Sequence, residues 1–89
     1  MNESDFRIEA IARGYSEPRF KEFEPNLFSE MHGHDFAVFG LVTRGVLRLG
    51  YEDGSEAVFN VGEYCELPEG KSHSERTGSD GATFYLATK

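Results

Sequence analysis

The distribution of apolar and polar residues along the chain predicts short strands joined by tight turns. Apolar runs are brief and ten glycines interrupt them, a pattern typical of strands. Residues 36–42 form an apolar, β-branched run, which indicates a strand buried on both faces. Residues 19–24, RFKEFE, alternate charged with aromatic side chains, as in a half-exposed edge strand.

The strongest local signal is a hairpin in the segment VLRLGYEDGSEAVF. Asp53-Gly54 is a preferred pair for a two-residue turn. Pairing outward from that turn sets Leu49 opposite Val58. One face of the hairpin is then expected to carry Leu47, Leu49, Tyr51 and Val58. Residues 62–67 and 82–87 supply two further strands, and in the second of these Phe84 and Leu86 alternate with Tyr85.

One helix is expected, over residues 4–13. Ser4 is a suitable N-cap, and Gly14 lies where a left-handed residue commonly ends a helix. One face would carry Phe6, Ala10 and Arg13, and a second apolar edge Ile8, Ile11 and Ala12, so we expect the helix to lie on the strands. A short strand through Phe6 and Ile8 is the alternative.

The elements therefore predict an all-β domain with a short N-terminal helix. Residues 1–14 would form the helix or arm, and residues 15–89 six to eight antiparallel strands. Such strands usually close into a barrel or sandwich, which removes exposed edges. The 89 residues suffice for one domain. Because a free edge invites pairing, we expect a homodimer formed through the RFKEFE strand.

Composition narrows the expected partners and location. Sixteen acidic and nine basic side chains give a formal charge of −7, so neither nucleic acid nor an anionic membrane is an expected partner. No apolar run approaches 18 residues, so no bilayer-spanning helix is expected. The N-terminal MNESDF is unlike a secretory signal, and the single Cys65 allows no internal disulfide. We therefore expect a cytoplasmic protein.

The three histidines form the clearest chemical signal. His32 and His34 are two residues apart, and on a strand such residues point to the same face. His73 follows Pro68, Gly70 and Lys71 in a predicted turn. Neutral imidazoles in this arrangement suit a borderline divalent metal ion such as Fe, Zn, Ni or Mn.

Two segments resemble the sequence motifs of the cupin superfamily. HGHDFAVFGLVTRG, residues 32–45, is similar to the first motif, in which His-x-His is followed by Glu and then Gly. GEYCELPEGKSH, residues 62–73, matches the second at Gly62, Pro68, Gly70 and His73. The resemblance implies a small single-domain cupin, with a jelly-roll (double-stranded β-helix) barrel and one divalent metal ion at His32, His34 and His73.

The sequence departs from these motifs at two positions. The usual Glu ligand falls at Val38, which cannot bind metal, and the Asn that often closes the second motif falls at Thr77. The resemblance therefore implies a three-histidine site. By strand parity, Glu30 or Glu75 is a possible fourth ligand or base, although solvated carboxylates are the more ordinary interpretation.

Several further residues are candidates for the core and the wall of the pocket. Val38, with Phe36, Phe39, Leu41 and Val42, is taken as core and cavity wall. Cys65 is expected to be a small buried hydrophobe, and Tyr64 and Glu66 face the opposite side of the same strand. Tyr64 and Glu66 are possible pocket residues if their side points into the barrel, and Tyr85 is a further candidate. Arg44 and Arg48 are possible partners for a carboxylate ligand, although Arg44 precedes a turn glycine and is expected to be exposed.

Three functional hypotheses follow from these residues. The first is a metal-binding module that takes a small polar or anionic molecule, and the second is a metal-dependent enzyme of dioxygenase, isomerase or lyase type. The third is a metal-free dimeric scaffold. No Ser-His-Asp set, phosphate-binding loop or dinucleotide fingerprint is present in the chain.

Overall fold

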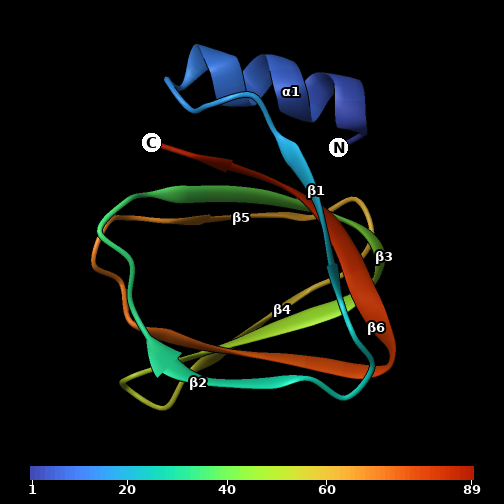
Figure 1. Cartoon of the computed structure of the whole chain (residues 1–89), viewed down its shortest axis with the longest axis vertical. Helices are drawn as coiled ribbons and strands as arrows, with labels where there is room; N and C mark the ends of the chain where they lie inside the picture. Colours follow the sequence, from blue (N-terminus) through green and yellow to red (C-terminus); the bar gives the residue numbers. More distant parts are fainter.

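A computed structural model describes the whole chain, residues 1–89, as one helix followed by six antiparallel strands (Figure 1). The prediction of an all-β barrel with a short N-terminal helix is confirmed. The elements are α1 (Glu3–Ala12), β1 (Arg19–Phe23), β2 (Phe28–His32), β3 (Val38–Tyr51), β4 (Glu56–Phe59), β5 (Tyr64–Leu67) and β6 (His73–Thr88).

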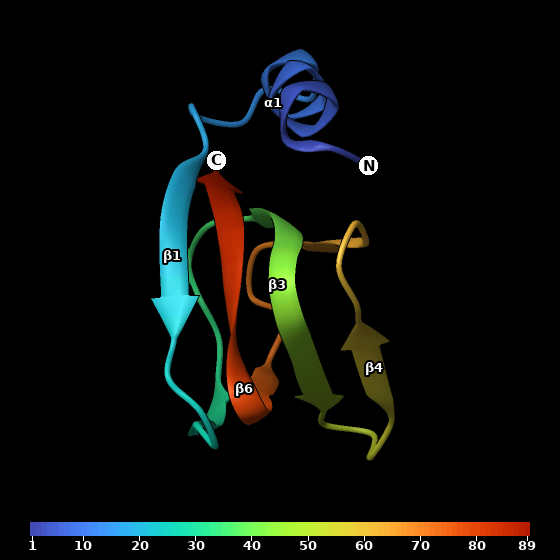
Figure 2. The same ribbon diagram turned by 90° about the vertical axis from the view of Figure 1, so that its right-hand side faces the viewer.

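Two long strands, β3 and β6, are shared between two facing layers. They pair antiparallel from Val38 opposite Thr88 to Tyr51 opposite His73. The first part of β3 also pairs with β5, and the last part of β6 pairs with β1. The other ends pair with β4 and β2. Figure 2 shows β1, β6, β3 and β4 side by side, as the pairing requires.

The long strands pass between layers at a pair of glycines. The β3–β6 register shifts between Val42 and Arg44 and again between Gly45 and Leu47. Gly45 and Gly81 both have positive φ, 77° and 67°. A Cβ on Gly45 would overlap the Gly81 carbonyl oxygen. Only glycine at position 45 therefore allows the two backbones to approach this closely.

Alternation along the strands creates two separate apolar cores. Phe39 and Leu41 face outward from the barrel and pack with Phe6, Ala10, Tyr15 and Ala87 under α1. Their neighbours Val38 and Val42 face inward and pack with Leu47, Leu49 and Leu67. The expected burial of this strand on both faces is confirmed, and its two faces belong to different cores.

The helix lies on the outer face of the upper layer in Figure 1. Its N-cap is Asn2, whose side-chain oxygen accepts a hydrogen bond from the Asp5 amide, and not Ser4 as predicted. Phe6 and Ala10 are fully buried, whereas Ile8 and Ile11 are exposed, so the second apolar edge is not part of the buried core. The alternative of a strand through Phe6 and Ile8 is wrong. No helix in the structure is long and apolar enough to cross a membrane.

The hairpin forms, but its predicted register is wrong by one residue. Leu49 pairs with Ala57 and Arg48 with Val58. The loop has three residues, because the Gly54 amide donates to the Tyr51 carbonyl and the Tyr51 amide donates to Ser55. This is the arrangement of a turn followed by a left-handed glycine. The shift exposes Val58 and turns Phe59 inward.

Replacing Gly45 by Ala should prevent the crossing of β3 and β6. We expect Gly45→Ala to lower the free energy of unfolding by about 3 kcal/mol or more, because strain at positive φ adds to backbone overlap. Urea denaturation followed by circular dichroism measures the change.

Gly54→Ala is the matched control for this substitution. Gly54 also has positive φ, at 86°, but a Cβ there meets no atom within 4 Å. Its cost should be about 1–2 kcal/mol, from the left-handed conformation alone. Equal losses in the two variants would contradict a special role for the crossing.

Candidate metal centre and cavity

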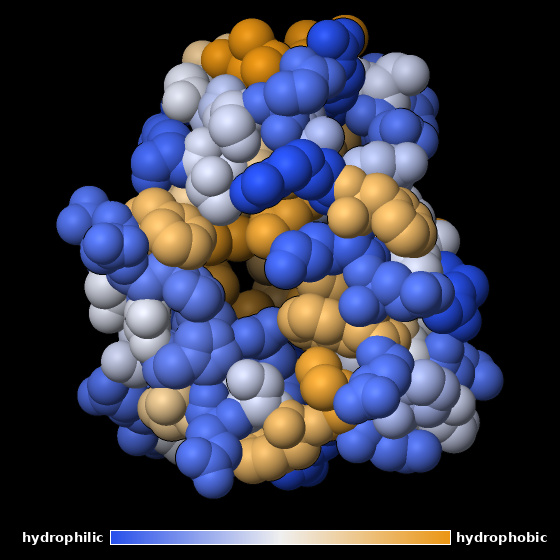
Figure 3. All heavy atoms as spheres, viewed as in Figure 1, coloured by the Kyte–Doolittle hydropathy of each residue, from blue (hydrophilic) through white to orange (hydrophobic).

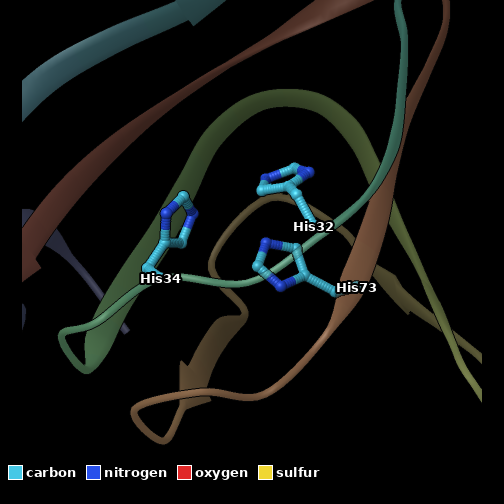
Figure 4. A group of neighbouring side chains, drawn as sticks. All are labelled: His32, His34 and His73. Carbon is cyan, nitrogen blue, oxygen red and sulfur yellow. The ribbon is translucent and has the colours of Figure 1, made fainter.

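His32, His34 and His73 lie together at one end of the barrel, with their rings turned toward one another (Figure 4). One nitrogen from each ring lies within 4.8 Å of the other two. The ring centroids are 4.6 to 5.4 Å apart. His73 is buried, and the other two rings are partly exposed.

Strand pairing and one turn bring the three histidines together. His32 ends β2 and pairs with His73, the first residue of β6. His34 lies beyond the end of β2 in the connection to β3, so its direction is not set by strand parity. The Gly70 amide donates to the His34 carbonyl over 2.8 Å. That bond holds the first motif against the turn that precedes His73.

Backbone carbonyl groups fix the orientation of two of the rings. His32 Nδ1 lies 2.6 Å from the Glu30 carbonyl oxygen, and His73 Nδ1 lies 2.9 Å from that of Lys71. A carbonyl only accepts, so each Nδ1 carries a proton and donates it. In the neutral rings Nε2 then bears a lone pair, which is the form that binds metal.

Glu75 brings a carboxylate to the same cluster. Its Oε1 lies 2.9 Å from His32 Nε2 and 3.8 Å from His73 Nε2. Only 17% of the Glu75 side chain is exposed. Glu75 is therefore a partly buried carboxylate beside the histidines, in the place that a fourth ligand or a base would take. The Glu30 side chain is absent from the cavity lining, and this residue contributes its backbone carbonyl instead.

The environment of His34 favours its neutral form. Its ring stacks on Phe36 with centroids 4.8 Å apart. Burial, followed by the neighbouring His32 and His73, holds the pKa of His34 below the ordinary histidine value. A neutral ring keeps the lone pair that a metal ion requires.

The distances within the cluster are close to those that one metal ion would require. Two ligand atoms about 2.1 Å from the same ion lie about 3.0 Å apart at a right angle and about 4.2 Å apart when opposite. The two Glu75 contacts, 2.9 and 3.8 Å, fall at or close to this range. The histidine nitrogens need only a small movement inward. Three imidazoles and one carboxylate therefore fit a divalent ion.

The barrel encloses a cavity of about 470 Å³ that reaches this cluster. Eleven of its nineteen lining residues are hydrophobic, among them Val42, Leu47, Leu49 and Phe84. His34, His73 and Glu75 also line it. Figure 3 shows a hollow on the face drawn there, with apolar atoms in its depth. The volume lies in the range of small-molecule sites.

The structure places the predicted pocket residues on different faces. Val38 lines the cavity, as does Cys65. Tyr64 and Glu66 do not, because β5 turns them toward α1: Glu66 accepts hydrogen bonds from Arg13 and Tyr15. Desolvation raises the pKa of the inward Cys65 thiol to about 11, so this thiol remains protonated at neutral pH.

Tyr85 also lies outside the cavity lining. It faces outward on β6, where its ring contacts Phe20 edge-on at 5.8 Å. Its neighbours Phe84 and Leu86 take the inward positions. The alternation of 82–87 was predicted, but the face that points inward was not.

The two residues that depart from the cupin motifs, Val38 and Thr77, lie in different surroundings. Val38 occupies a cavity-facing position, but its side chain is apolar. Thr77 is buried and joins β6 to the segment between β1 and β2. Its hydroxyl donates to the Glu24 carbonyl over 2.7 Å and accepts from the Leu27 amide. Thr77 therefore has a structural role outside the histidine cluster.

Two basic residues that line the cavity were not identified as cavity residues from the sequence. Arg19 and Lys21 line the cavity, whereas Arg44 and Arg48 do not. Arg48 pairs with Glu56, and Arg44 donates to the Asp80 carbonyl. The alternation in RFKEFE could have identified Arg19 and Lys21, because residues 19, 21 and 23 share one face of β1.

Solved structures with the same fold support the motif resemblance. An RmlC-like cupin from Shewanella frigidimarina has a TM-score of 0.66 at 17% identity, over 81% of this chain and 64% of that one. A cupin 2 conserved barrel domain protein from Salinispora arenicola gives 0.68 at 21%, over 78% and 58%. The DMSP lyase DddQ from Ruegeria pomeroyi gives 0.70 at 16%, over 79% and 36%.

The match to these structures is partial in length and low in identity. In all three, this chain spans less than two-thirds of the other chain. No family model and no curated protein matches the sequence. The likeness therefore concerns the arrangement of the strands, in agreement with the motifs around His32 and His73. This chain of 89 residues has the cupin fold.

Proposed function

We propose that the protein binds one divalent metal ion through His32, His34, His73 and Glu75, and binds a small molecule in the adjoining cavity. The observation that carries the proposal is the 2.9 Å approach of His32 Nε2 and Glu75 Oε1. The Nδ1 proton of His32 is already donated to Glu30. In the neutral ring, two lone-pair atoms therefore face each other.

Such a contact requires a positive group between or on the two atoms. Either His32 carries a second proton, or a cation binds both the imidazole nitrogen and the carboxylate oxygen. A divalent ion also uses the converging nitrogens of His34 and His73. The carboxylate reduces the net charge of the bound ion, as a motif Glu at position 38 would have done.

The ligand types narrow the choice of metal. Three imidazoles and a carboxylate suit Fe, Zn, Ni or Mn, whereas Ca and Mg prefer oxygen ligands. When bound, such an ion supplies a Lewis acid that polarises a carbonyl or carboxylate oxygen. The chain's own cavity residues supply the apolar surface that surrounds the remainder of the small molecule.

Binding is favoured over catalysis by the contents of the cavity. Among the lining residues, Glu75 is the single carboxylate, and the proposed metal site uses it. The Cys65 thiol, with its pKa of about 11, is a poor nucleophile at neutral pH. No further general base lines the cavity.

A metal-dependent enzyme is the second candidate function. It is supported by the position of His34, His73 and Glu75 on the cavity wall, which lets a bound molecule reach the ion. One structural neighbour, DddQ, is described as a DMSP lyase. Turnover of an added substrate by the metal-loaded protein separates this candidate from a binding module.

Removing single ligands should weaken zinc binding in a graded way. We expect His34→Ala to lower Zn²⁺ affinity by more than about 100-fold, because even groups that only orient ligands are worth 10- to 100-fold. Glu75→Gln should lower it by about tenfold or more, since the negative charge is lost. Competition titration with a chromophoric chelator measures both affinities.

Glu56→Gln is the control, because Glu56 is an exposed carboxylate paired with Arg48 on the barrel exterior. Its zinc affinity should equal that of the wild type. Stoichiometric, tight binding by His34→Ala would refute the ligand set. Wild-type affinity in Glu75→Gln would remove Glu75 from it.

Zinc affinity should decrease as the pH falls. Protons compete with metal for each imidazole, and a histidine ordinarily titrates near pH 6.5. The lowered pKa of His34 places its own competition at lower pH. We expect a small change between about pH 8 and 7, and a fall of tenfold or more per unit below about pH 6. If the zinc affinity stayed the same down to about pH 5.5, the proposal of imidazole ligands would be contradicted.

A further inference from the structure

Two of the nine basic side chains have no partner within the chain. Four arginines pair with carboxylates: Arg7 with Glu17, Arg13 with Glu9, Arg44 with Glu22, and Arg48 with Glu56. Three other cations lie over aromatic rings: Lys71 over Tyr51, Arg76 over Phe28, and Lys89 over Tyr15. The side chains of Arg19 and Lys21 make no hydrogen bond, ion pair or cation–π contact.

These two side chains both line the cavity. Arg19 and Lys21 are two residues apart on β1, so they project from the same face, about 7 Å apart along the strand. The intervening Phe20 is 59% exposed on the opposite face. In a chain of charge −7, acidic side chains are abundant, yet no carboxylate oxygen lies within 4.0 Å of either cation.

Most of the other residues that line the cavity are apolar. Its walls are formed by apolar side chains from β3, β5 and β6, including Val42, Leu49 and Phe84. The single carboxylate in the lining, Glu75, lies beside His32 and His73. Arg19 and Lys21 are themselves exposed, so the cavity combines unpaired positive charge at its solvent-accessible side on β1 with an apolar interior.

We propose that Arg19 and Lys21 bind the anionic group of the protein's ligand, and that this ligand is a small carboxylic acid with an apolar body. The guanidinium of Arg19 presents paired donors that match a carboxylate, and Lys21 adds a second positive charge. The apolar walls receive the hydrocarbon part. The inference rests on the proposed function for the cavity being a ligand site, but it does not require the metal ion.

The test uses two probes that differ in one group, 4-phenylbutanoate and 4-phenylbutan-1-ol. Isothermal titration of the metal-free wild type should show the acid binding about tenfold or more tightly than the alcohol, because charge-assisted hydrogen bonds exceed neutral ones. The preference should weaken as salt is added. In Arg19→Gln/Lys21→Gln the two probes should bind equally, with the affinity for the alcohol unchanged.

Arg48→Gln is the control, since Arg48 is a basic residue outside the cavity and should leave the preference intact. Repeating the titrations with zinc-loaded protein separates this inference from the metal proposal. A preference that appears only with zinc, and survives in the double variant, would assign carboxylate binding to the metal and overturn the role of β1. Equal affinities in the wild type, or no binding of either probe at millimolar concentration, would also overturn it.

Discussion

The antiparallel pairing of β3 with β6 is the constraint on which the rest of the structure depends. It runs from Val38 opposite Thr88 to Tyr51 opposite His73, so each strand belongs to both layers of the barrel. The other strands add to the edges of this pair. The crossing at Gly45 and Gly81 lets both strands change layer together.

The pairing of β3 with β6 sets the geometry of the site. β6 begins at His73, and two residues later Glu75 projects on the same side, where β2 brings His32. The inward side of β3 and β6 supplies apolar walls, and the inward side of β1 supplies Arg19 and Lys21. One alternation therefore places a metal-binding cluster, an apolar surface and two cations around one cavity. This combination suits an amphipathic anion, which narrows the small polar or anionic molecule expected from the sequence.

The sequence predicted the fold because local signals and motif spacing agreed. Glycine-punctuated apolar runs, the Asp53-Gly54 turn and the paired cupin motifs all indicate an antiparallel barrel. The prediction failed where a single residue decides orientation. The hairpin loop has three residues, which moves Val58 outward, and β5 turns Cys65 inward in place of Tyr64 and Glu66. Since strand side chains alternate, an error of one residue reverses a whole face.

Contacts between residues far apart in the sequence were the second feature that could not be predicted. Three histidines were identifiable from their spacing, but the role of Glu75 depends on its distance from His32, 43 positions away. Likewise, Arg19 and Lys21 were recognisable as charged edge residues, whereas their lack of partners is a property of the folded chain. Homodimer formation through β1 remains a prediction, as does the cytoplasmic location.

Anomalous X-ray diffraction at the absorption edge of the metal, on crystals of protein purified without an affinity tag, tests the central claim most directly. The account predicts one peak per chain, within about 2.1 Å of Nε2 of His32 and His73, a ring nitrogen of His34 and a Glu75 carboxylate oxygen. The absence of a peak at this position after soaking in zinc, or a metal ion bound elsewhere on the chain, would contradict the proposed site.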